Sequence, residues 1–229
     1  MRILALLLIT WTAVAAQASE TPKPAIPASG TLNKIVIEVL RAYPTDGTHA
    51  YHWPKEGSWK GCTKDLMYRG QVLAKGDPKK RAYCCGLTFE VFLQSWLQWC
   101  ERSGHESSVA GLGLEGLRQL QSQWFGSKED PTCHQTAMLK NGIGHVVENW
   151  EEALPGDFVQ LWRNNKSGHS VIFLEWVREG KEIVGLKYWS TQPSTKGIGE
   201  RVERFGAGKQ DMDRSKFYLC RLGVPSVAR

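Results

Sequence analysis

The chain has 229 residues, a formal net charge of +6 at pH 7 and six cysteines. Its length fits one domain, and no internal repeat or low-complexity run divides it. The positive charge suits an anionic partner such as a cell wall or a membrane surface. The Lys and Arg residues are dispersed and follow no motif that reads nucleic acid, so a nucleic-acid partner is not expected.

The first residues predict a cleavable export signal. Arg2 precedes an apolar run that begins at Ile3, and Ala16-Gln17-Ala18 has the small-x-small pattern of a cleavage site. Residues 1–18 are therefore predicted to be a signal peptide, which implies a secreted or periplasmic protein. The apolar run is shorter than the about 20 residues that span a bilayer, and no later run is long enough, so stable membrane insertion is not expected.

Residues 19–30 are rich in Pro, Ala and Ser, which predicts a solvated linker without a core. The domain itself is predicted over 31–229. Its first helix is indicated over 31–42, because apolar residues recur there at i, i+3, i+4, i+7 and i+8, and Tyr43-Pro44 ends it. Residues 45–82 lack a helical period, which indicates loops with short turns or strands.

Three more helices are expected before the pattern changes to that of strands. A continuous apolar stripe predicts a long helix from residue 84 to about 102, and weaker patterns predict helices over 113–125 and 134–140. Strands are predicted over 157–162, 169–177, 183–190 and 217–222. Helices followed by strands indicate an α+β domain with an antiparallel sheet.

The segment Tyr83-Cys84-Cys85-Gly86-Leu87-Thr88 places a cysteine where irregular chain becomes helix. The unpaired N–H groups and the dipole of a helix N-terminus favour an anion, and they would lower the pKa of a thiol placed there. Gly86 would let another backbone or a substrate approach closely. From this segment alone, the two cysteines could equally be core residues or disulfide partners.

The segment Ser167-Gly168-His169-Ser170 puts a histidine at the start of a predicted buried strand, just after a turn. The strand would fix the ring while the sheet end exposes it, as a general base requires, although a lone histidine in such a place is more often structural. Metal chemistry is not expected, because the chain has no CxxC pair and no HExxH motif. No other cofactor is predicted.

Together these segments resemble the signature of the NlpC-type cysteine peptidases, papain-like enzymes that cleave cell-wall peptides. The matching residues are Cys84-Cys85-Gly86-Leu87-Thr88, Gly156-Asp157 and Gly168-His169-Ser170-Val171. The resemblance covers roughly residues 31–192. It implies a papain-like fold in which the cysteine-bearing helix packs on an antiparallel sheet, with Cys84 as nucleophile and His169 as base. Residues 104–145 are interpreted as a helical insertion, and Tyr83 and Cys85 depart from the Asp and Ser that the family usually has.

The resemblance also implies a third catalytic residue on the strand after the histidine strand. Strand alternation puts Ser190 and Gln192 on one face, and the Gln192 amide oxygen could accept from the imidazole, so Gln192 is the predicted third residue. An ordinary turn residue before a proline is the alternative. The candidates for contacts with the substrate or the oxyanion, besides the Cys84 backbone N–H, are Tyr68, Tyr51 and Ser190.

The function implied by the resemblance is hydrolysis of peptide or amide bonds through an acyl-enzyme, with peptidoglycan as the expected substrate. Two alternatives stay open. One is an amidase, transpeptidase or acyltransferase that uses the same Cys-His pair. The other is a non-catalytic wall-binding module in which the cysteines are structural; titration of the thiols would distinguish the two classes.

Overall fold

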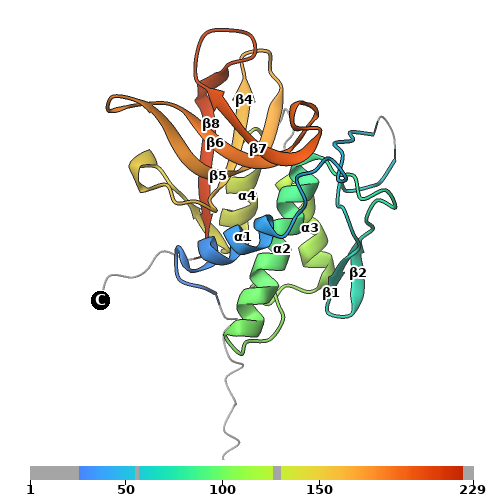
Figure 1. Ribbon diagram of the computed structural model, residues 1–229. Helices are drawn as coiled ribbons and strands as arrows, with labels where there is room; N and C mark the ends of the chain where they lie inside the picture. Colours follow the sequence, from blue (N-terminus) through green and yellow to red (C-terminus); the bar gives the residue numbers. More distant parts are fainter. Residues whose placement is uncertain (1–25, 55–56, 126–129, 224–229) are drawn as a thin grey trace, which may run out of the picture.

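The computed structural model describes residues 26–54, 57–125 and 130–223 (Figure 1). The predicted signal peptide, residues 1–18, lies outside these ranges, as does most of the predicted linker. The described end of that linker belongs to the domain, since Pro27 is buried and Ile26 packs against the core. The linker prediction rested on the composition of the whole segment and overlooked that its Ile-Pro pair is apolar enough to cover core surface.

Four helices form where the apolar periodicity predicts them. They are α1 (Thr31–Arg41), α2 (Cys84–Arg102), α3 (Leu114–Trp124) and α4 (Cys133–Lys140). Helix α2 is the central one, with 14 of its 19 residues buried. Within the described ranges, no helix combines the length and the hydrophobicity that a membrane crossing requires.

A six-stranded antiparallel sheet follows the helices, which confirms the predicted α+β class. In spatial order its strands are β3 (Gly144–Val146), β8 (Met212–Leu222), β4 (Phe158–Arg163), β5 (Gly168–Glu179), β6 (Glu182–Gln192) and β7 (Gly197–Arg204). A separate hairpin joins β1 (Leu66–Tyr68) to β2 (Gln71–Ala74). Strands β3 and β7 were not predicted, because both lie at sheet edges and carry few apolar side chains.

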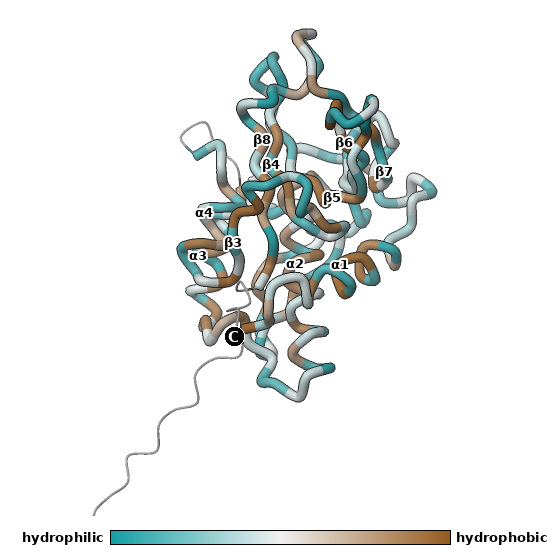
Figure 2. The backbone as a smooth tube through the Cα atoms, turned by 90° about the vertical axis from the view of Figure 1, so that its left-hand side faces the viewer, coloured by the Kyte–Doolittle hydropathy of each residue, from teal (hydrophilic) through white to brown (hydrophobic). Residues whose placement is uncertain are grey.

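Apolar residues cover both faces of the sheet. On one face, Ile172 of β5 joins a core that the four helices share, while its neighbours Val171 and Phe173 join a second core on the other face. In Figure 1 the helices lie below the curled strands, and Figure 2 shows hydrophobic and hydrophilic positions alternating along α1 and α3. Because successive side chains of a strand point to opposite faces, one sheet can pack against two cores.

The first turn of α2 is held by a close backbone contact. A Cβ on Gly86 would overlap the carbonyl oxygen of Lys60 and the backbone of Gly61, so only glycine fits there. This confirms the close approach expected at Gly86 and shows that its partner is another stretch of backbone. The contact holds the backbone of residues 60–61 against the first turn of α2, close to Cys84.

A buried ion pair ties the helical layer to the sheet. The Asp157 carboxylate is fully buried and accepts two hydrogen bonds of 2.7 Å from the Arg221 guanidinium. It also accepts bonds from the Asn33 side chain of α1, at 2.8 Å, and from the Leu154 backbone N–H, at 2.8 Å. Asp157 is therefore a structural residue that joins α1, β8 and the turn before β4.

We predict that Asp157→Ala lowers the free energy of unfolding by about 3–5 kcal/mol, because it leaves the Arg221 guanidinium buried without its carboxylate. Urea unfolding followed by tryptophan fluorescence measures the change. Glu179→Ala is the matched control, since it removes an exposed carboxylate paired with Arg204 and should leave the midpoint nearly unchanged. Equal midpoints for the two variants would contradict the structural role of Asp157.

Candidate active site

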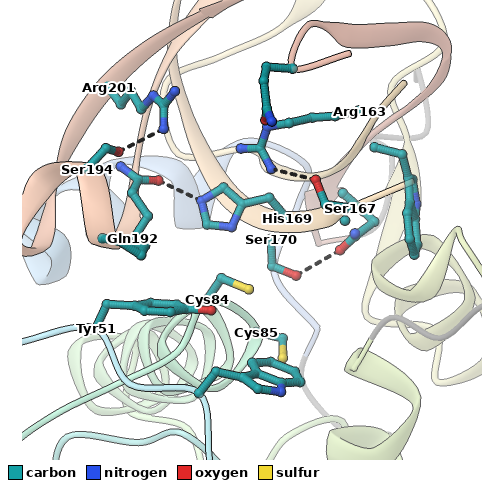
Figure 3. A pocket seen from close by; sticks show the side chains of 16 residues that line it. Tyr51, Cys84, Cys85, Arg163, Ser167, His169, Ser170, Gln192, Ser194 and Arg201 are labelled. Carbon is teal, nitrogen blue, oxygen red and sulfur yellow. Dashed lines mark hydrogen bonds between the residues drawn. The ribbon is translucent and has the colours of Figure 1, made fainter. Parts of the chain in front are cut away.

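A cleft of about 590 Å³ opens between the N-terminus of α2 and the adjoining ends of β5 and β6. Cys84, His169 and Gln192, which are far apart in the sequence, all line it. In Figure 3, Cys84 and Tyr51 lie on the helix side, and His169 and Gln192 lie opposite on the strand side. The fold therefore brings together the three residues that the sequence predicted as the reacting group, the base and the orienting amide.

Cys84 is the first residue of α2, so it lies at the end of the helix where the N–H groups of the first turn have no partner within the helix. The residue before it, Tyr83, is extended and caps no helical N–H with its side chain. A hydrogen bond from Cys85 is the main cause that lowers the pKa of the Cys84 thiol well below its ordinary value, against the opposing effect of burial. The His169 ring and the Ser170 backbone N–H add to the lowering.

Cys85 has the opposite properties. Burial is the largest cause that raises the pKa of its thiol well above the ordinary value, and the neighbouring Cys84 raises it further. Its side chain packs in the core and also reaches the wall of the cleft, next to Cys84. The sequence indicated the buried position of Cys85 but not its place in the cleft wall.

His169 is held rigidly at the start of β5. It is buried, and its Nε2 lies 2.7 Å from the Oε1 atom of Gln192. Because Gln192 occupies Nε2, Nδ1 is the ring nitrogen left to interact with Cys84. The Tyr188 ring packs edge-on against the imidazole, with the ring centroids 5.6 Å apart, and restricts its rotation.

Gln192 is itself oriented by further contacts. Its Nε2 donates to Thr195 Oγ1 at 3.2 Å, which leaves Oε1 for the imidazole. The Tyr188 hydroxyl lies 3.1 Å from Gln192 Oε1 and 2.7 Å from Glu203 Oε1, placed to donate its one proton to either. A buried polar chain thus leads from His169 through Gln192 and Tyr188 to Glu203.

Of the other three candidate residues, one lines the cleft and two do not. Tyr51 lines the cleft, and burial, followed by the nearby Cys84 and Cys85, raises the pKa of its phenol to about 12, so it stays a neutral donor. Tyr68 does not line the cleft; its hydroxyl bonds the backbone of Leu112 and Val109. Ser190 is fully buried outside the cleft lining and donates to the Ser170 carbonyl at 2.7 Å. Tyr68 and Ser190 are therefore structural residues here.

Several residues of the cleft wall were not predicted. They are Trp53, Trp162, Arg163, Ser167, Ser194 and Arg201, among others. Arg201 lies on β7, an edge strand without a clear sequence pattern, so no local signal could have placed it. Trp53 is 58% exposed, and this exposure distinguishes it from the core tryptophans only in the folded structure.

All six cysteines are buried free thiols in the structure. Cys133 lies close to the site, with its thiol 3.4 Å from Gln160 Oε1, and Cys220 donates to the Phe158 carbonyl. Burial raises the pKa of both thiols. In the described part of the chain, no group of three or more His, Cys, Asp or Glu side chains is arranged to hold a metal ion. Among these thiols, Cys84 is the one whose surroundings favour the thiolate, since its pKa is lowered while burial raises the pKa of the others named here.

We predict that iodoacetamide labels one thiol rapidly near neutral pH and that this thiol is Cys84. A lowered pKa means that the thiolate already dominates below the ordinary cysteine value of about 8.5, so the labelling rate should level off well below that pH. Cys84→Ser should abolish the rapid labelling, as followed by mass spectrometry over a pH series.

Substitutions of Cys85 supply the control. Cys85→Ser keeps a donor beside Cys84 and should keep rapid labelling, whereas Cys85→Ala removes the donor and should move the inflection to higher pH. Rapid labelling that persists in Cys84→Ser and vanishes in Cys85→Ser would move the nucleophile by one residue.

The chain matches no family model, and comparisons with curated proteins and with solved structures likewise yield no match.

Proposed function

We propose that this protein is a cysteine hydrolase of papain-like type that cleaves peptide or amide bonds, with Cys84 as nucleophile and His169 as base. The observation that carries the proposal is a thiol at a helix N-terminus that shares an open cleft with an imidazole whose Nε2 is held by an amide oxygen. Nucleophile, base and orienting group in this order are the arrangement that acyl transfer requires.

In the first half of the reaction, the Cys84 thiolate adds to the carbonyl carbon of the substrate. The developing oxyanion would be stabilised by the backbone N–H of Cys84, and the neutral Tyr51 phenol is a second donor on the same side of the cleft. The C–N bond then breaks, and protonated His169 gives its proton to the leaving nitrogen. A thioester between Cys84 and the acyl group remains.

In the second half, His169 takes a proton from water while the water oxygen adds to the thioester carbonyl. The C–S bond breaks, the carboxylic acid leaves, and the thiolate–imidazolium pair is restored. Gln192 keeps the ring in one orientation throughout, because its Oε1 accepts from Nε2 in both protonation states. Gln192 is thus a positioning residue.

The proposed substrate is the peptide part of peptidoglycan. Three features support this choice: the predicted export signal, the net charge of +6 and the resemblance of the Cys84 and His169 segments to cell-wall peptidases. The cleft also carries an exposed aromatic side chain, Trp53, on its rim, which suits a large and partly apolar ligand.

We predict that the protein releases peptides with cleaved cross-links or stems from purified peptidoglycan, as identified by mass spectrometry. His169→Ala should lower this release at least about 100-fold while the circular dichroism spectrum is preserved, because the thiol loses its base. His105→Ala, at an exposed position outside the cleft lining, is the control. Release of free amino sugars in place of peptides would contradict the proposal.

We also predict that Gln192→Ala lowers kcat/KM by about 100-fold, because the imidazole loses the contact that fixes its orientation. The rate of iodoacetamide labelling at neutral pH should fall as well, which a purely structural defect elsewhere would not cause. Gln98→Ala on α2 serves as control, since Gln98 accepts a hydrogen bond from Arg102 at the surface and lies outside the cleft lining. Unchanged labelling and turnover in Gln192→Ala would show that His169 needs no orienting amide.

A further inference from the structure

Apart from the proposed Cys84–His169 pair, the charged side chains of the cleft are all positive. Among its lining residues, all of which lie in the described ranges, Arg163 and Arg201 are charged and none is Asp or Glu. Both arginines lie on the strand side, opposite Cys84 (Figure 3). A cleft with this lining attracts an anionic group to the strand side of the nucleophile.

The two arginines share a single carboxylate behind the cleft wall. Glu203 is buried and accepts from Arg163 Nε at 2.9 Å and from Arg163 Nη2 at 2.6 Å. Arg163 Nη1 also donates to Ser167 Oγ at 3.4 Å, and the Arg163 side chain is only 13% exposed, so little of it is accessible to a ligand. Because one negative charge faces two positive charges, the group carries a net charge of one positive unit.

Arg201 is the more exposed of the two arginines and keeps a donor group for a ligand. Its Nε is 3.4 Å from Glu203 Oε1, and its Nη1 donates to Ser194 Oγ at 2.8 Å. Neither contact uses Nη2, and 39% of the side chain is exposed. The Ser194 contact holds the guanidinium against the cleft wall, so that its remaining N–H groups are available to a ligand.

We propose that Arg201, positioned by Ser194, forms a subsite for a carboxylate of the substrate, so that the enzyme prefers amides that carry an acidic group next to the scissile bond. The inference rests on the proposed function in one respect, namely that Cys84 is the reacting group. A guanidinium binds a carboxylate through paired N–H groups, and the cleft lining offers no acidic side chain that would repel the ligand.

Three isosteric alkylating probes test the subsite without need of a substrate. N-iodoacetyl-glutamine carries a main-chain carboxylate, N-iodoacetyl-glutamic acid α-amide carries a side-chain carboxylate, and N-iodoacetyl-glutamine amide is neutral. In each case the Cys84 thiolate forms an S–C bond and iodide leaves. At least one acidic probe should label Cys84 faster than the neutral probe, and the faster of the two identifies which carboxylate the subsite takes.

Arg201→Gln should reduce the ratio of acidic to neutral labelling rates, both measured on the same variant, by about 5-fold to 10-fold. The imidazolium of His169 also attracts anions, so a matched loss of charge is needed as control. Arg204→Gln removes a positive charge from the same strand, at a position paired with Glu179 outside the cleft lining, and should keep the wild-type ratio.

The same ratio in wild type and Arg201→Gln would overturn the subsite, as would equal losses in Arg201→Gln and Arg204→Gln. A preference that depends on Arg201, in a protein that releases no peptide from peptidoglycan, would support the subsite and count against the proposed hydrolysis. A protein in which no probe labels Cys84 would overturn both.

Discussion

Helix α2 is apolar around most of its circumference, so it is stable only when other elements cover it on all sides. The sheet covers one side, since Phe158, Ile172 and Trp189 share its core, and α1, α3 and the segment before Cys84 cover the rest. This burial sets the depth and the angle of the helix relative to β5 and β6. The position of the N-terminal cysteine next to His169 is a direct consequence, because both residues belong to elements that the same core holds together.

Burial by itself disfavours the thiolate form of Cys84, and neighbouring groups offset this effect. The free N–H end of α2, the Cys85 side chain and the Ser170 backbone all stabilise negative charge on Cys84. The two adjacent cysteines thereby differ in character, since burial raises the pKa of Cys85 and makes it a reliable donor. One thiol acts on the substrate in the proposed reaction and the other supports it.

The strand side of the site depends on the second core of the sheet. Tyr188 packs with the apolar residues of that core, and its hydroxyl connects Gln192 to Glu203, which in turn neutralises Arg163. The orientation of the imidazole and the charge of the cleft wall are thus linked through one buried polar chain. Arg201 joins this chain at its exposed end, where the proposed carboxylate subsite lies.

The sequence by itself determined the α+β class, the four helices and strands β4–β6 and β8, because apolar periodicity acts over a few residues. The grouping of Cys84, His169 and Gln192 was an expectation implied by the family resemblance, and the fold places all three in one cleft. Only the tertiary structure decided that Tyr51 and Cys85 line the cleft while Tyr68 and Ser190 do not. It alone placed β7, and with it Arg201, at the cleft. These features depend on side-chain rotation and on contacts between distant segments, and no local pattern encodes either, since each is settled by how the layers pack.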